Sequence, residues 1–76
     1  MKKLVLNYIG LDSWSRPVYK DESNKLFVDV DNREGRKAEI CTKYNNMFDG
    51  EPDTPIGYID RYKDLEIKFL PKRIIR

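Results

Sequence analysis

The chain contains no histidine and a single cysteine, Cys41, among its 76 residues. Without an imidazole it cannot assemble a Ser-His-Asp or Cys-His nucleophilic pair, and zinc and iron sites lose their commonest ligand. A single thiol forms neither an intramolecular disulfide nor a cysteine-rich metal site. Secreted domains of this size usually depend on disulfides, so this composition favours a cytoplasmic protein.

Glycine-rich motifs and long apolar runs are also missing. The four glycines are isolated, and neither a phosphate-binding loop nor a dinucleotide fingerprint is present. The apolar run after Met1-Lys2-Lys3 is broken at Asn7 and Gly10, which makes it too short for a signal peptide or a membrane span. A chain of this length buries roughly 60% of its unfolded surface. We therefore expect one domain, residues 1–76, which is not an enzyme and needs no cofactor.

What the chain does contain is typical of a small globular protein with a charged surface. Apolar residues make up 39% and charged residues 37% of the sequence, with a net charge of +2. Nine aromatic residues (five Tyr, three Phe and one Trp) supply core material and separate this composition from that of a disordered chain.

Alternation of apolar and polar residues, the period of a strand, recurs along the chain. It predicts strands at residues 4–9, 16–20, 25–30 and 65–69, the first of them buried on both faces and the last ending at Pro71. Residues 37–43 fit either a strand or the start of a helix, and the β-branched Ile40 and Thr42 favour the strand. The fold class expected is mostly β, a small antiparallel sheet or open barrel of about five short strands.

Turn residues separate these strands. Residues 21–24 form a polar loop between two β-rich runs, which predicts a hairpin with Asn24 in the left-handed conformation. Residues 45–57 are expected to be a long irregular segment, because Pro52 and Pro55 disfavour a regular ladder. Residues 58–62 fit either a short strand or a helical turn.

The segment FDGEPDTPIG, residues 48–57, carries three carboxylates and no base, at Asp49, Glu51 and Asp53. Their spacing is that of calcium ligands, but an EF-hand loop needs glycine at its sixth position and glutamate at its twelfth, where this chain has Thr54 and Asp60. We expect no metal. Phe48 is predicted to anchor the loop in the core, leaving the carboxylates to bind a basic partner or backbone amides.

The segment DSWSRPVY, residues 12–19, is the second stretch that strand formation does not explain. Either Trp14 fills one end of the core, or it is exposed beside Arg16 as a stacking platform. Asp12 and Ser13 are expected to fix the loop through a side-chain turn. Cys41 is interpreted as a small buried apolar residue.

Residues 67–76 carry a net charge of +4. Lys68, Lys72, Arg73 and Arg76 occur there without an acid between residues 67 and 76. These four residues define the alternative function, an accessory nucleic-acid-binding domain.

Two blocks, YIGLDSWSRPVYKDESNKLFVDV (8–30) and CTKYNNMFDGEPDTPI (41–56), resemble a large polyvalent protein-associated domain found in small bacterial (Firmicutes) proteins and in proteins of phages and conjugative elements. The resemblance covers about half the chain. In such sequences the hairpin turn carries a glycine, where this chain has Asn24-Lys25. The resemblance implies a mobile-element context and carries over no catalytic residue.

The leading hypothesis is a non-catalytic protein-interaction module. Its predicted interaction surface consists of Trp14, Arg16, Asp49, Glu51 and Asp53. A protein partner is expected, nucleic acid is the alternative partner, and no membrane is involved. The chain itself is expected to be a monomer or a weak homo-oligomer, because an uncovered edge strand can pair with its own copy.

Overall fold

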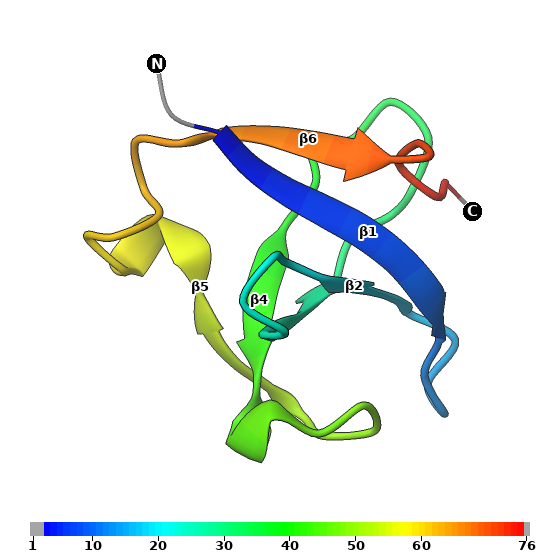
Figure 1. The fold of residues 1–76 in the computed structure, drawn as a ribbon. Coiled ribbons are helices and arrows are strands. Elements are labelled where there is room, and N and C mark those ends of the chain that lie inside the picture. The colour runs from blue at the N-terminus through cyan, green and yellow to red at the C-terminus, as the bar shows by residue number, and fades with distance from the viewer. Residues whose placement is uncertain (1–2, 76) are drawn as a thin grey trace.

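The computed structural model describes residues 3–75, which form one six-stranded sheet in the order β5-β4-β3-β2-β1-β6 (Figure 1). The elements are β1 (Lys3–Leu11), β2 (Pro17–Lys20), β3 (Leu26–Asp29), β4 (Ile40–Lys43), a 3-10 turn η1 (Tyr44–Asn46), β5 (Pro52–Pro55), a second 3-10 turn η2 (Ile56–Tyr58) and β6 (Glu66–Leu70). The predicted small, mostly β domain is confirmed. The sheet is mixed rather than antiparallel throughout, because β6 pairs with β1 in parallel.

Strand β1 is buried on one face only. Leu4 and Leu6 point into the core, whereas Asn7 and Ile9 are exposed, so the expectation of burial on both faces was wrong. The pairing of β1 with β2 shifts register between Tyr8 and Gly10. At this shift the strand changes direction, and Gly10 takes a φ of 141° that side-chain-bearing residues rarely adopt.

The hairpin of β2 and β3 forms as predicted. Asn24 has a φ of 65°, and the backbone N–H of Asp21 donates to the carbonyl of Lys25. The Asp21 carboxylate accepts hydrogen bonds from the N–H groups of Ser23 and Lys25, both at 2.9 Å. This side-chain turn fixes the loop without a glycine, which explains how the chain tolerates asparagine at a position that needs positive φ.

Within residues 37–43 the strand is confirmed for Ile40–Lys43, which form β4 and are buried along its whole length, and the 3-10 turn η1 follows directly. The segment 45–57 is more regular than predicted, because Pro52–Pro55 form the edge strand β5 beside β4. Prolines are tolerated there since an edge strand uses only half of its N–H groups. A register shift between Cys41 and Lys43 and a side-chain bond, from Thr54 N–H to Thr42 Oγ1 at 3.2 Å, complete the pairing.

The core lies on one face of the curved sheet. It consists of buried side chains from four strands, η2 and the turn after it, at Leu4, Leu6, Tyr19, Phe27, Ile40, Ile56 and Tyr62. A tilted aromatic contact joins Tyr19 to Phe69 and an edge-on contact joins Phe27 to Tyr62, with ring centroids 5.0 and 5.5 Å apart. Val18, Val28 and Cys41, which alternate with core residues, are buried on the opposite face.

The remaining predictions concern the last third of the chain. Of the two alternatives for residues 58–62 the turn is present: η2 ends at Tyr58, Ile59 is extended, and a new turn follows in which Tyr62 N–H donates to the Ile59 carbonyl. Strand β6 ends before Pro71 as expected, and the N–H of Ile74 then donates to Tyr19 Oη at 3.0 Å. Among residues 3–75 no helix has the length and apolar character that crossing a bilayer would require.

Candidate functional site

The loop between β1 and β2 is built around the carboxylate of Asp12. Its Oδ1 accepts hydrogen bonds from the N–H groups of Trp14 and Arg16, at 2.9 and 3.0 Å. The backbone closes the same loop, since Asp12 N–H donates to the Arg16 carbonyl and Ser15 N–H donates to the Asp12 carbonyl. The predicted side-chain turn at Asp12 is confirmed. It repeats, bond for bond, the turn that Asp21 makes at the other end of β2, a correspondence that the sequence reading missed.

This turn holds Trp14 out of the core. The indole is 66% exposed, and the Arg16 guanidinium carbon lies 5.7 Å from the centroid of its ring. Of the two alternatives for Trp14, the core plug is therefore wrong and the exposed pair with Arg16 is present. Ser15 takes a φ of 61° next to it, so the backbone of this loop occupies a conformation that only a well-determined turn maintains.

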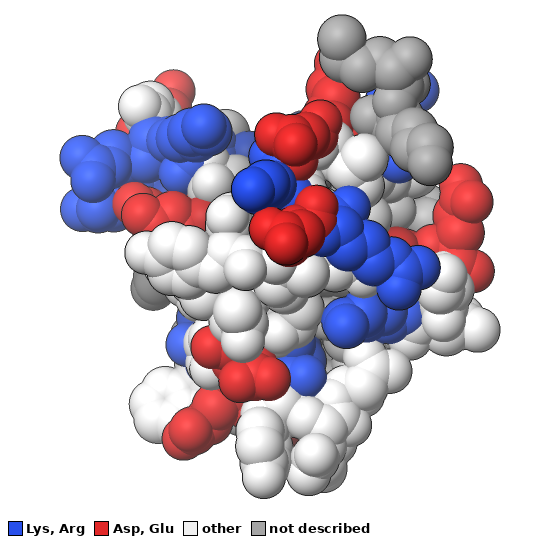
Figure 2. All heavy atoms as spheres, turned by 90° about the vertical axis from the view of Figure 1, so that its left-hand side faces the viewer, with Lys and Arg blue, Asp and Glu red and all other residues white. Residues whose placement is uncertain are grey.

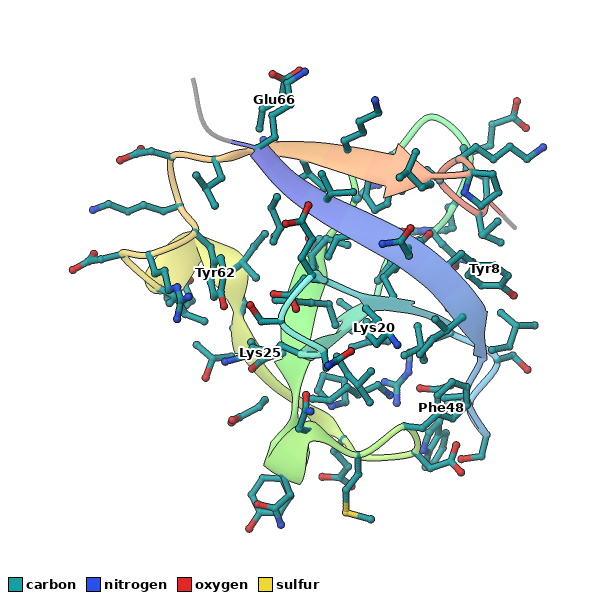
Figure 3. All side chains as sticks on the ribbon, viewed as in Figure 1. Tyr8, Lys20, Lys25, Phe48, Tyr62 and Glu66 are labelled. Atoms are coloured by element: carbon teal, nitrogen blue, oxygen red, sulfur yellow. The ribbon has the colours of Figure 1, made fainter. Side chains whose placement is uncertain are left out.

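We call the segment that joins β4 to β5 the acidic loop. It begins with η1, where Asn45 and Asn46 have φ values of 54° and 53°. Phe48 was expected to anchor this loop in the core, but it is 36% exposed and lies against Gly10, where an added Cβ would come within 3.4 Å of its ring. Figure 3 shows Phe48 under the C-terminal end of β1. The anchor is therefore the outer surface of β1, and Gly10 provides the space for it.

A buried ion pair connects the two loops. Lys43 Nζ lies 2.6 Å from Asp12 Oδ2 and donates a second hydrogen bond to the Gly50 carbonyl at 2.9 Å, and both charged side chains are 0% exposed. The Arg16 Nε lies 3.4 Å from the same carboxylate oxygen. Burial raises the pKa of Asp12, but the hydrogen bonds from Lys43 and from the two backbone N–H groups outweigh it and hold the pKa below its ordinary value.

A second bond joins the loops at the surface, where the N–H of Ser13 donates to Asp49 Oδ1 at 2.9 Å. The structure thus brings together three of the five predicted interaction residues, Trp14, Arg16 and Asp49. Glu51 directly precedes β5 and Asp53 lies within it, and both residues are exposed. We call these five residues, with Phe48, the two-loop surface.

Lys43 is the residue that sequence reasoning missed. Its ammonium group is paired with the Asp12 carboxylate. The prediction that Cys41 is a buried apolar residue is confirmed, and burial raises the pKa of its thiol. A lysine buried at the end of a strand requires a carboxylate, but Asp12 lies 31 residues away along the chain, so no local pattern points to the pair.

The basic residues of the alternative site are differently placed. Lys68 and Lys72 are exposed, while Arg73 turns inward, where its Nε lies 3.3 Å from buried Asp29 and its Nη2 donates to the Asp31 carbonyl at 2.8 Å. Arg76 lies outside the described residues. The charge of Arg73 is therefore paired with Asp29 within the fold. Elsewhere, Figure 2, which views the side of the molecule carrying β5, shows acidic and basic side chains lying next to one another.

Within residues 3–75, three or more metal-ligating side chains do not come together at any place, and this includes the Asp49, Glu51 and Asp53 loop. Comparisons of the chain with protein-family models, with curated proteins and with solved structures gave no match. The resemblance to large polyvalent protein-associated domains stays a prediction.

Proposed function

We propose that this protein is a non-catalytic interaction module that binds a protein partner through the two-loop surface. The observation that carries the proposal is the exposed Trp14, held outward by a turn that a buried ion pair ties to a second loop. Burial of a tryptophan in the core of a small domain stabilises the fold, because its large apolar area is removed from water. The exposure of Trp14 forgoes this stabilisation, which supports a role in binding.

The rigidity of the surface supports binding. The Trp14 turn is closed by two backbone and two side-chain hydrogen bonds, and its neighbour Asp49 is fixed by the bond from Ser13. Little conformational entropy remains to be lost when a partner binds, so more of the contact energy is available as affinity. Tryptophan and arginine are also the residues most often found at energetic centres of protein interfaces.

The charge of the surface indicates the chemistry of the partner. The Asp49 carboxylate accepts a hydrogen bond from the Ser13 amide. Glu51 and Asp53 are exposed, and among the described residues neither Glu51 nor Asp53 forms an ion pair. We propose a partner that places an apolar or planar group on Trp14 and basic side chains opposite Glu51 and Asp53. Such exposed charges accelerate association more than they stabilise the complex.

Affinity capture from a lysate of the source cell, followed by titration with the purified captured protein, tests the proposal. Trp14→Ala is expected to weaken binding by roughly 10-fold or more, the effect of removing an interface centre. Tyr58→Ala is the matched control, because Tyr58 is an 83% exposed aromatic residue on η2, away from both loops.

The paired variant Glu51→Gln with Asp53→Asn is expected to slow association and to reduce its dependence on salt. Capture of the same proteins with the same affinity by wild type and by Trp14→Ala would remove the proposal. Equal losses for Trp14→Ala and Tyr58→Ala would also oppose it, since they would show that general stickiness drives the capture.

A further inference from the structure

Strand β6 leaves one of its edges open. Among residues 3–75 it pairs with β1 alone and stands at the end of the strand order, so the backbone groups along its other edge have no strand partner. Natural proteins usually cover or shorten such edges, because an open edge is a template for another strand.

The core opens beside this edge. A groove of about 680 Å³ runs between β6 and the segments around β4 and η2, and its apolar lining includes Ile40, Ile56, Ile67 and Phe69. The side chains at Leu65, Ile67 and Phe69 face this side of the sheet and are only half-buried. Glu66 and Lys68 alternate with them on the outer face and are exposed.

We propose that β6 pairs antiparallel with β6 of a second copy of this chain, about a two-fold axis at Ile67. In this register Glu66 of each copy lies opposite Lys68 of the other, Leu65 lies opposite Phe69, and Ile67 lies opposite itself. Two opposite-charge pairs form on the outer face, and the inner apolar side chains extend each core beyond the groove. Directly opposed unlike charges stabilise a strand pair, and like charges destabilise it.

The charge pattern selects one register. With a two-fold axis perpendicular to the sheet, one strand can slide along the other only in steps of two residues, because directly opposite side chains must lie on the same face. One such shift places Lys68 opposite Lys68, and the other places Glu66 opposite Glu66. Only the pairing centred on Ile67 is complementary throughout, which is the property of an isologous interface. The proposal is independent of the two-loop surface, which lies at other loops of the fold.

The interface is short, so we expect a weak dimer with a Kd in the micromolar range or above. Sedimentation velocity of the whole chain over a concentration series reaching about 1 mM covers this range. A chain that stays monomeric throughout would overturn the proposal.

Charge substitutions make the test specific. Lys68→Glu and Glu66→Lys should each weaken dimerisation by roughly 10- to 30-fold, because each replaces two attractive pairs by two repulsive ones. The double variant, Glu66→Lys with Lys68→Glu, restores both pairs and is expected to return within about threefold of wild type. Circular dichroism and thermal unfolding of dilute samples verify that all variants fold.

A simple effect of net charge predicts a different result. From the value of +2, Lys68→Glu gives 2 − 2 = 0 and Glu66→Lys gives 2 + 2 = +4. Mutual repulsion of whole molecules would therefore make the first variant associate more strongly and the second less strongly. That outcome, or dimerisation lost in Trp14→Ala and kept in Lys68→Glu, would overturn the proposal.

Discussion

The buried pair of Asp12 and Lys43 gives the sharpest prediction about stability. Asp12→Asn keeps an acceptor for the Trp14 and Arg16 amides but leaves the Lys43 ammonium buried without its counter-ion. Removal of one partner of such a pair costs about 3–5 kcal/mol. A domain of this length has roughly 4–11 kcal/mol of total stability, so this substitution removes a large part of it.

The reverse substitution is expected to cost less. Lys43→Met leaves the Asp12 carboxylate with two backbone donors and with the Arg16 guanidinium, whose Nε lies 3.4 Å away. We expect a loss of about 1–3 kcal/mol. The double variant buries no unpaired lysine charge, so its loss should be smaller than the sum of the single losses by about 2 kcal/mol.

Urea unfolding followed by far-ultraviolet circular dichroism measures all three variants. Lys63→Met is the control, because the ion pair of Lys63 with Asp60 is exposed and is expected to contribute less than about 1 kcal/mol. If Asp12→Asn does not fold, recovery of folding in the double variant tests the same coupling. Additive losses, or a larger loss for Lys43→Met than for Asp12→Asn, would refute the reasoning.

The same pair predicts a pH dependence. Because the folded pKa of Asp12 lies below its ordinary value, this carboxylate contributes stability that is present above that value. The contribution is lost as the pH falls through the lowered folded pKa. Asp12→Asn should therefore reduce the slope of stability against pH on the acid side.

Two further substitutions test the buried pair of Arg73 with Asp29 and the close approach of the backbone at Gly50. Arg73→Met is expected to cost about 2–4 kcal/mol at neutral pH, because it leaves buried Asp29 without its cation. Burial raises the folded pKa of Asp29, so the deficit should shrink as the pH falls through that pKa and the carboxyl becomes neutral; a deficit equal at neutral pH and at about pH 4, in urea unfolding, would contradict this. Gly50→Ala should cost about 1–3 kcal/mol, since the new Cβ would lie 2.6 Å from the Tyr44 carbonyl oxygen. Gly57→Ala, whose Cβ would meet no described atom within 4 Å, is the control and should be close to neutral in thermal unfolding.

Local patterns in the sequence predicted the local parts of this fold. The alternation in residues 25–30 and the turn chemistry of Asn24 defined the hairpin, and the β-branched Ile40 and Thr42 favoured the strand that became β4. Asp12 was recognised as a turn residue because an aspartate binds the amides that follow it along the same chain. These inferences needed no knowledge of distant contacts.

The errors concern contacts between distant residues. The parallel partner of β1, the inward turn of Arg73 and the burial of Lys43 depend on how strands are ordered, which periodicity does not report. Prolines at positions 52 and 55 argued against pairing, but an edge strand tolerates them. Of the candidate site, the sequence identified the exposed residues and missed the buried lysine that joins the two loops.

The pairing of residues 3–7 with residues 66–70 has a consequence for the order in which the chain folds. Each of the strands β1 to β5 pairs with a strand that is adjacent to it in the sequence, so these strands can assemble as they leave the ribosome. The second edge of β1 stays uncovered until residues 66–70 have been translated. Closing that long loop is entropically the most demanding contact, so the attachment of β6 is expected to be the step that completes folding.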